Sequence, residues 1–144
     1  MTRLRRATPE DLPAIEALLR ACELPLDDAA AAFESGVVAR DGDAIVGAAA
    51  VERYGASGLL RSVAVDPGHR ENGLGRALVA AAEALARDQG IRDLYLLTET
   101  AGRWFPRLGY ATVPRDEAAA AVGASVEFTT ACDVTAVAMR KTLA

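Results

Sequence analysis

Residues 60–76 read LRSVAVDPGHRENGLGR, and this stretch contains the end of a strand, a loop and the start of a helix. The apolar run up to Val65 predicts a strand, which the Asp-Pro-Gly at 66–68 ends. Apolar residues at helical spacing then predict a helix over 73–89, with Gly90 as its C-terminal stop. The arrangement is therefore strand, glycine-containing loop, helix.

This loop is predicted to bind an anion. Backbone N–H groups converge where a helix begins, and the helix dipole is positive there. Gly73 and Gly75 allow a close approach of the ligand, and Arg70 can offer a charged fork to a phosphate oxygen. A pyrophosphate is the natural ligand. The spacing matches neither the P-loop pattern nor the dinucleotide fingerprint, so the sequence contains no motif for nucleotide hydrolysis or NAD binding.

The chain before this stretch is predicted to form a strand, two helices and a set of antiparallel strands. Thr8 and Pro9 mark the start of a helix whose apolar face continues to Cys22. A second short helix begins at Asp27 or Asp28. The predicted strands are 3–7, 37–40, 44–54 and 59–65, the last three joined by turns at 41–43 and 55–58.

After the long helix the pattern alternates between strand and helix. The predicted elements are a strand at 93–98, a short helix at 103–108, a strand at 110–113, a helical turn at 118–121 and a final strand at 134–139. Strands before, between and after the helices predict a mixed α/β sheet.

Composition limits the classes of function. A length of 144 residues predicts one domain over 1–144. Net charge is −4, with both signs spread along the chain, so no basic patch for nucleic acid is expected. Two cysteines and one histidine, far apart, supply neither a disulfide framework nor a metal site. No long apolar segment is present, and we expect a cytoplasmic protein without membrane contact.

The sequence R-E-N-G-L-G at 70–75 resembles the acetyl-CoA loop, [QR]-x-x-G-x-[GA], of the GCN5-related N-acetyltransferases (GNAT family). The resemblance extends to V-A-V-D-P before the loop and to W-F-P-R-L-G-Y at 104–110. L-Y-L-L-T-E-T followed by R-W-F-P-R-L-G-Y is similar to the acetyltransferase domain of N-acetylglutamate synthases. L-L-R-S-V-A-V, the V-E-F at 126–128 and the closing A-V-A-M-R-K-T-L are still closer to the small arsenic-resistance N-acetyltransferases.

The resemblance implies a largely antiparallel central sheet of about seven strands with helices on both faces. It also implies direct transfer of acetyl from acetyl-CoA to the amine of a small amino acid or amino-acid-like compound, including an arsenic-containing one. The strand before the loop should splay from its neighbour and leave the Val65 N–H free to polarise the thioester carbonyl. Homodimers are common in the family. The implied acetyl-CoA contacts are Val63, Ala64, Val65, Arg70, Glu71, Asn72, Gly73, Leu74, Gly75 and Arg76.

Two positions depart from the family pattern. The usual general acid is a tyrosine, and Phe105 stands at that position; water or the hydroxyl of Tyr54 or Thr98 is left as a substitute. The position of the family's carboxylate base falls near Leu59, so Glu52 is the remaining candidate base.

Arg61 is the candidate substrate-binding residue. Pairing across the turn at 55–58 sets Tyr54 opposite Leu59 and Glu52 opposite Arg61, with Arg61 facing the same side as Val65. Arg61 then either holds a substrate carboxylate or only pairs with Glu52.

Other residues have plainer interpretations. Trp104 and Phe105 are expected in the core rather than as a stacking platform, and His69 is expected to be inert beside the loop. Cys22 and Cys132 offer two thiols, too few for a convincing trivalent-arsenic site, and burial is the commoner outcome.

Two rival functions stay open. The missing tyrosine is compatible with an acyl-CoA-binding sensor that does not turn over. A protein or peptide N-acetyltransferase would keep the chemistry and change the acceptor, and the sequence does not choose between acceptors.

Overall fold

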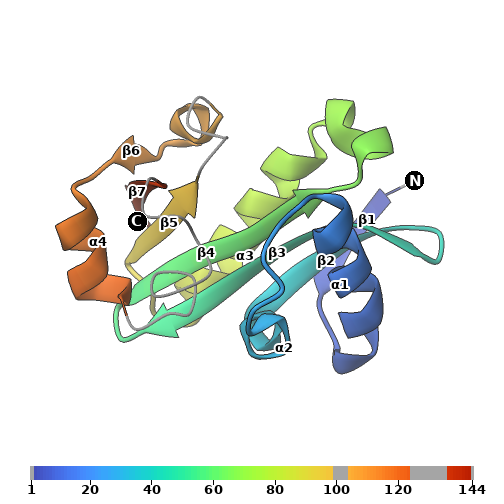
Figure 1. The fold of residues 1–144 in the computed structure, drawn as a ribbon, viewed down its shortest axis with the longest axis horizontal. Helices are drawn as coiled ribbons and strands as arrows, with labels where there is room; N and C mark the ends of the chain where they lie inside the picture. The colour runs from blue at the N-terminus through green and yellow to red at the C-terminus, as the bar shows by residue number, and fades with distance from the viewer. Residues whose placement is uncertain (1, 99–103, 124–135, 144) are drawn as a thin grey trace.

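A seven-stranded sheet forms the centre of the computed structural model, which describes residues 2–98, 104–123 and 136–143 (Figure 1). The strand order is β1-β2-β3-β4-β5-β7-β6. Every neighbouring pair is antiparallel except β4 and β5, which run parallel. The strands are β1 (Thr2–Arg6), β2 (Gly36–Asp41), β3 (Ala44–Tyr54), β4 (Ser57–Val65), β5 (Asp93–Thr98), β6 (Ala111–Thr112) and β7 (Val137–Thr142).

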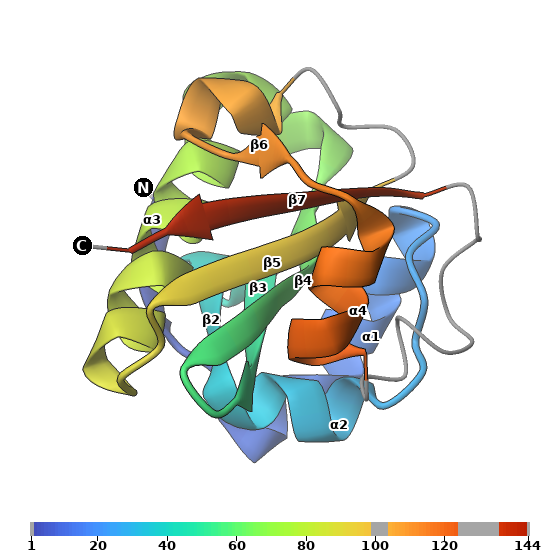
Figure 2. The same ribbon diagram turned by 90° about the vertical axis from the view of Figure 1, so that its left-hand side faces the viewer.

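Helices cover both faces of this sheet, as predicted (Figure 2). On one face, Leu78 and its neighbours in α3 pack with Leu60 of β4. On the other face, Ile15 and Leu19 of α1 pack with Ala48 of β3. In the described part of the chain no helix is long and apolar enough to cross a membrane. The helices are η1 (Pro9–Asp11), α1 (Leu12–Ala21), α2 (Ala29–Ala32), η2 (Phe33–Ser35), η3 (Pro67–Asn72), α3 (Leu74–Asp88), η4 (Phe105–Leu108) and α4 (Arg115–Val122).

The C-terminal elements differ most from the sequence prediction. The helical turn predicted at 118–121 is the longer helix α4, because Ala118 and Val122 bury against Leu59 of β4. The final strand, predicted to end at 139, continues to Thr142 because β7 pairs with the whole of β5. Residues 134 and 135, where that strand was predicted to begin, lie outside the described residues.

The register between β3 and β4 also corrects the prediction. The turn is two residues long, with Gly55 at φ +68°, so Tyr54 pairs with Ser57 and Glu52 pairs with Leu59. The prediction assumed a four-residue turn and placed Glu52 opposite Arg61. Ala50 is the residue opposite Arg61.

A bulge in β4 reverses the direction of Arg61. Ala50 pairs with Arg61 but Ala48 pairs with Ala64, so β4 has one residue more than β3 over this interval. The extra residue is Ser62, with φ +56°. Simple alternation would put Arg61 on the same face as Val63. With the bulge, Arg61 faces α1 and α2, and the predicted direction is wrong.

The parallel pairing of β4 with β5 is short. It runs from Ser57 and Asp93 to Leu59 and Tyr95. Beyond Leu59, β4 stays paired with β3 as far as Val65, while β5 stays paired with β7. The two strands therefore diverge, as expected from the family resemblance, and a gap opens in the sheet along the second half of β4.

Candidate active site

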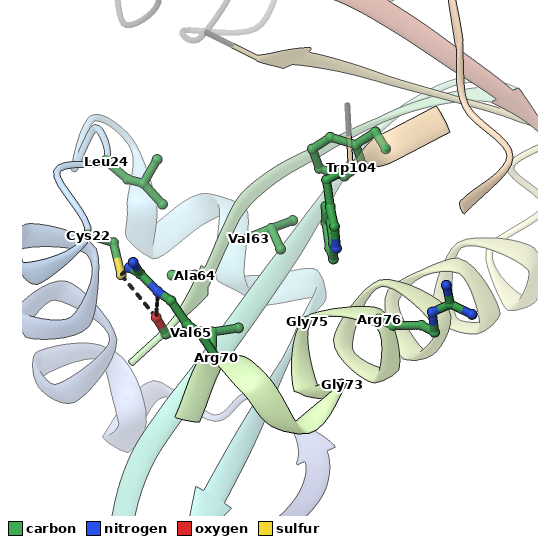
Figure 3. Close-up of a pocket in the computed structure, with 11 residues that line it drawn as sticks. Cys22, Leu24, Val63, Ala64, Val65, Arg70, Gly73, Gly75, Arg76 and Trp104 are labelled. Carbon is green, nitrogen blue, oxygen red and sulfur yellow. Dashed lines mark hydrogen bonds between the residues drawn. The ribbon is translucent and has the colours of Figure 1, made fainter. Parts of the chain in front are cut away.

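A cleft of about 540 Å³ occupies the gap beside β4 (Figure 3). Its floor is the end of β4, and its walls come from the end of α1 on one side and the start of α3 on the other. Two aromatic residues from the η4 region close a third side. The lining residues are Cys22, Leu24, Val63, Ala64, Val65, Arg70, Gly73, Gly75, Arg76, Trp104 and Phe105.

The backbone of β4 presents an open edge to this cleft. The Asp66 N–H donates to the Val46 carbonyl of β3 at 2.8 Å. Backbone groups alternate in direction along a strand, so Val63 and Val65 turn their N–H and C=O groups away from β3 and into the gap. Ala64, which the family resemblance also implied as an acetyl-CoA contact, turns its backbone N–H and C=O groups toward β3.

The loop after β4 ends in the first turn of α3, at the edge of the cleft. Gly73 has φ +71° and precedes Leu74, the first residue of α3. The Ala77 N–H donates to the Gly73 carbonyl at 3.2 Å. The N–H groups of Leu74, Gly75 and Arg76 precede that bond, so they point out of the end of the helix, where an anion is favoured.

The predicted acetyl-CoA contacts of this loop differ in what their side chains do. Leu74 is buried in the core, so only its backbone faces the helix end. The side chains of Glu71 and Asn72 lie outside what the structure describes. A Cβ on Gly75 would lie 3.0 Å from the Trp104 ring, so a glycine is needed for this close approach.

Arg70 lies at the strand end of the cleft. Its Nε donates to the Val65 carbonyl at 3.0 Å, and its Nη2 lies 3.5 Å from the Cys22 sulfur. The Cys22 thiol lies 3.5 Å from the same carbonyl (Figure 3). The sequence predicts a buried cysteine, and the structure places the half-buried Cys22 in the cleft wall instead. Cys132 lies outside the described residues.

His69 bridges the loop to the β2–β3 hairpin. Its Nδ1 lies 3.0 Å from Asp66 Oδ2 and its Nε2 lies 3.1 Å from Asp41 Oδ2. These hydrogen bonds, first to Asp41 and then to Asp66, raise the pKa of His69 above its usual 6.5. His69 is therefore a connecting residue between two surface segments, a role that its position in the sequence did not indicate.

The predicted acid Tyr54, base Glu52 and substrate residue Arg61 come together in one cluster on the face of the sheet that α1 and α2 cover. Arg61 Nη1 donates to Glu52 Oε2 at 2.9 Å, and the Tyr54 hydroxyl donates to Glu52 Oε1 at 2.6 Å. Glu52 pairs with Leu59, six residues before Val65, or about 20 Å of extended strand. Glu52 and Tyr54 thus lie toward the other end of the hairpin from Val65, whereas Arg61 is two residues before Val63.

The model of an acetyltransferase (GNAT) domain matches residues 32–112, which is more than half of the chain. The chain belongs to the GNAT acetyltransferase family. The predicted family is thereby confirmed.

Relatives of this GNAT domain include larger proteins. An amino-acid acetyltransferase from Neisseria meningitidis serogroup A is 29% identical over 128 residues, covering 79% of this chain and 28% of the relative. The chain thus spans little more than a quarter of that relative's length.

Solved structures share the fold. N-acetylglutamate synthase from Neisseria gonorrhoeae, complexed with coenzyme A and N-acetyl-glutamate, has a TM-score of 0.86 and 23% identity over 100% of this chain and 35% of its own. A GNAT-family acetyltransferase from Staphylococcus aureus has a TM-score of 0.80 and 15% identity, covering 100% of both chains. The predicted fold class is confirmed.

This GNAT domain has phenylalanine where the family's tyrosine acid was expected. Phe105 is 6% exposed and borders the inner end of the cleft. Its ring lies edge-on between Trp104, with centroids 4.8 Å apart, and Tyr110, at 5.6 Å. The Tyr110 hydroxyl donates to Glu83 at 2.8 Å, and neither residue lines the cleft. Phe105 is therefore a core residue as predicted, whereas Trp104 is half-buried and also lines the cleft.

Proposed function

We propose that this GNAT domain is an acetyl-CoA-dependent N-acetyltransferase that acetylates the amine of a small amino acid or amino-acid-like compound. The observation that carries the proposal is the position of the cleft. It begins on the open edge of β4 at Val63 and Val65 and ends at the N-terminus of α3. A long ligand with a thioester at one end and a pyrophosphate at the other matches those two features.

The loop and the first turn of α3 would hold the pyrophosphate. The N–H groups of Leu74, Gly75 and Arg76 favour negative charge there. Gly73 lines the cleft and adds no side chain, and Arg76 also lines it. The Arg70 guanidinium is bonded to the Val65 carbonyl and would have to turn to reach a phosphate oxygen. Glu71 and Asn72 complete the predicted set through their place in the loop.

The open edge of β4 would hold the reacting end of acetyl-CoA. The backbone of Val63 aligns the pantetheine chain, and the Val65 N–H donates to the thioester oxygen. As the amine attacks, charge develops on that oxygen, and one such donor stabilises it by about 3 kcal/mol. Holding amine and thioester together also replaces a bimolecular encounter with an intramolecular step. The C–S bond then breaks, CoA leaves as the thiolate, and the acetyl group passes directly to the amine without an acetylated enzyme residue.

Proton transfer needs no side-chain acid at residue 105. The amine loses one proton and the departing thiolate gains one, and water can serve both steps. Thr98 and Tyr54 stay candidate acids, and Glu52 stays a candidate base. The structure offers Glu52 another task, because its carboxylate already accepts hydrogen bonds from Tyr54 and Arg61.

Phe105 gives the first test of this mechanism. We expect Phe105→Tyr to leave kcat unchanged or to raise it modestly. Phe105→Leu should lower the free energy of unfolding by about 1–3 kcal/mol, since it removes two edge-on aromatic contacts of about 0.5–1.5 kcal/mol each, while kcat is retained. A large loss of kcat in Phe105→Leu, with acetyl-CoA affinity and melting temperature intact, would give the ring a catalytic task and contradict the mechanism.

The acceptor is proposed from relatives and from the sequence resemblance. Relatives named amino-acid acetyltransferases support an amino acid. The resemblance of L-L-R-S-V-A-V to arsenic-resistance enzymes supports an arsenic-containing analogue. A screen for release of free CoA over amino acids and their phosphorus and arsenic analogues tests both. We further propose a cytoplasmic location and a homodimer; gel filtration with light scattering would test the latter.

A second candidate function is an acyl-CoA sensor without turnover, which Phe105 favours because it cannot donate a proton. Calorimetric binding of acetyl-CoA together with no CoA release over the whole panel, peptides included, would support the sensor. CoA release only with peptides would identify a peptide N-acetyltransferase instead.

A further inference from the structure

Arg61 is a charged side chain sealed inside the protein. The residue is 2% exposed, and its side chain is the largest among the fully buried ones of the described residues. A guanidinium in such a place destabilises the fold unless its donors are all used. Nη1 donates to Glu52 at 2.9 Å, Nη2 to the Asp27 carbonyl at 2.7 Å, and Nε lies 3.3 Å from Ser62 Oγ.

These contacts join the two strands of one hairpin to a segment that is distant in sequence. Glu52 belongs to β3 and is held in turn by the Tyr54 hydroxyl at 2.6 Å. Ser62 is the bulged residue of β4. Asp27 belongs to the segment Glu23–Asp28, which connects α1 to α2. Arg61 is thus a polar link between the sheet and that segment, beside the apolar contacts of Leu24 and Leu26.

The backbone around Arg61 is strained. Among the described residues other than glycine, positive φ occurs at Glu23 (57°), Asp28 (59°) and Ser62 (56°). Two of these mark the ends of the segment, and the third is the bulge that turns Arg61 toward it. Such conformations persist only where the surroundings hold them in place, and they cluster at functional sites.

The same segment forms a wall of the cleft. Leu24 lies in the segment, and Cys22 directly precedes it; both line the cleft across β4 from Gly73 and Gly75 (Figure 3). The wall beside α3 would hold the pyrophosphate, so this opposite wall faces the acceptor. Arg61 holds the Asp27 carbonyl of this segment at 2.7 Å and so contributes to the position of the wall.

We propose that Arg61 is a positioning residue that sets the acceptor wall of the cleft by fixing the segment Glu23–Asp28 against β4. The role in acceptor binding rests on the proposed acetyltransferase function. It replaces the expectation that Arg61 holds a substrate carboxylate, because such a carboxylate would have to displace Glu52 or the Asp27 carbonyl from a sealed site.

Kinetics of Arg61→Lys test the role in acceptor binding. An ammonium cannot reproduce the fork that holds Glu52 and Asp27 together. We expect the acceptor KM to rise about tenfold, the scale of a lost charge-assisted hydrogen bond, with acetyl-CoA Kd unchanged within about twofold. The rise should be equal for the best amino-acid substrate and for its amide. The matched control Arg53→Lys, at an exposed arginine of the same hairpin, should leave both constants unchanged.

A second measurement does not depend on activity. The rate at which a thiol reagent labels Cys22, followed by mass spectrometry of that peptide, reports whether the wall is in place. We expect faster labelling in Arg61→Lys and in the milder Glu52→Gln, and the wild-type rate in Arg53→Lys.

The two measurements separate the possible failures. Wild-type labelling in both Arg61→Lys and Glu52→Gln overturns the positioning role. A rise in KM confined to the amino acid, with the amide unaffected, also overturns it and returns Arg61 to the substrate carboxylate. Absence of acetyl transfer in the wild type would overturn the proposed function, while the labelling rates would still decide whether Arg61 fixes the segment.

Discussion

Gly73 offers the sharpest test of the acetyl-CoA loop. Its φ is +71°, and a Cβ added there would meet nothing within 4 Å. The substitution Gly73→Val therefore creates no clash with the rest of the protein. Its effect is confined to the strained backbone conformation and to the isopropyl group placed in the cleft, beside the N–H groups of α3.

The expected magnitudes follow from these two effects. A side chain in the left-handed conformation destabilises the fold by about 1–2 kcal/mol, and more for a β-branched residue. Wild-type protein with acetyl-CoA at about 100 times Kd gains about 2.7 kcal/mol, which raises the melting temperature by roughly 5–10 °C. If valine weakens binding a hundredfold, the same ligand concentration gives only about 0.4 kcal/mol, or about 1 °C.

Thermal unfolding with and without acetyl-CoA measures both effects. Gly90→Val is the matched control, since Gly90 has φ +80°, is equally open to solvent and lies beyond the other end of α3. Both variants should melt lower than wild type, and only Gly73→Val should lose the ligand-induced shift. A full shift in Gly73→Val, or an equal loss in Gly90→Val, would refute the assignment of the loop.

Two further predictions concern charged side chains. The fold raises the pKa of His69 through its hydrogen bonds to Asp41 and Asp66, so its stabilising contribution is full below about pH 6.5 and is lost as pH rises through the raised pKa. The stability difference between wild type and His69→Gln in urea should shrink from pH 5.5 to pH 8.5; a difference that grows would contradict the bridge. Lys141→Met should destabilise the protein by about 3 kcal/mol, because Lys141 Nζ donates to the buried Glu83 at 3.0 Å. Adding Glu83→Gln should recover part of that loss in the same denaturation assay.

The loop and its strand could be predicted because their signals are local. Asp66 and Pro67 end a strand wherever they follow an apolar run, and Gly73 is compatible with a positive φ that few residues adopt. The boundaries of β3 and β5 were predicted to the residue, since apolar runs and turn signals flank them. These features depend on neighbours in sequence.

The direction of Arg61 could not be predicted, because its signal is not local. Ser62 adopts φ +56°, and serine is no marker of that conformation. Without the bulge, counting by twos from Val65 gives the wrong face. The turn at Gly55 is also shorter than predicted, so Glu52 pairs with Leu59 and not with Arg61. Sequence thus predicted that Glu52 and Arg61 meet, but by a pairing that the sheet does not use.

The division of the sheet affects how the chain folds. On one side of the gap, β1 to β4 are joined by antiparallel pairs. The pairs between strands that are near in sequence form early, because they close short loops at little loss of chain entropy. On the other side, β5, β7 and β6 pair among themselves. Among the described residues, only the three residue pairs from Ser57 to Leu59 join the two blocks through the sheet. We therefore expect the blocks to open as separate cooperative units in hydrogen exchange. The short junction between β4 and β5, beside the cleft, should be the last part of the sheet to form during folding.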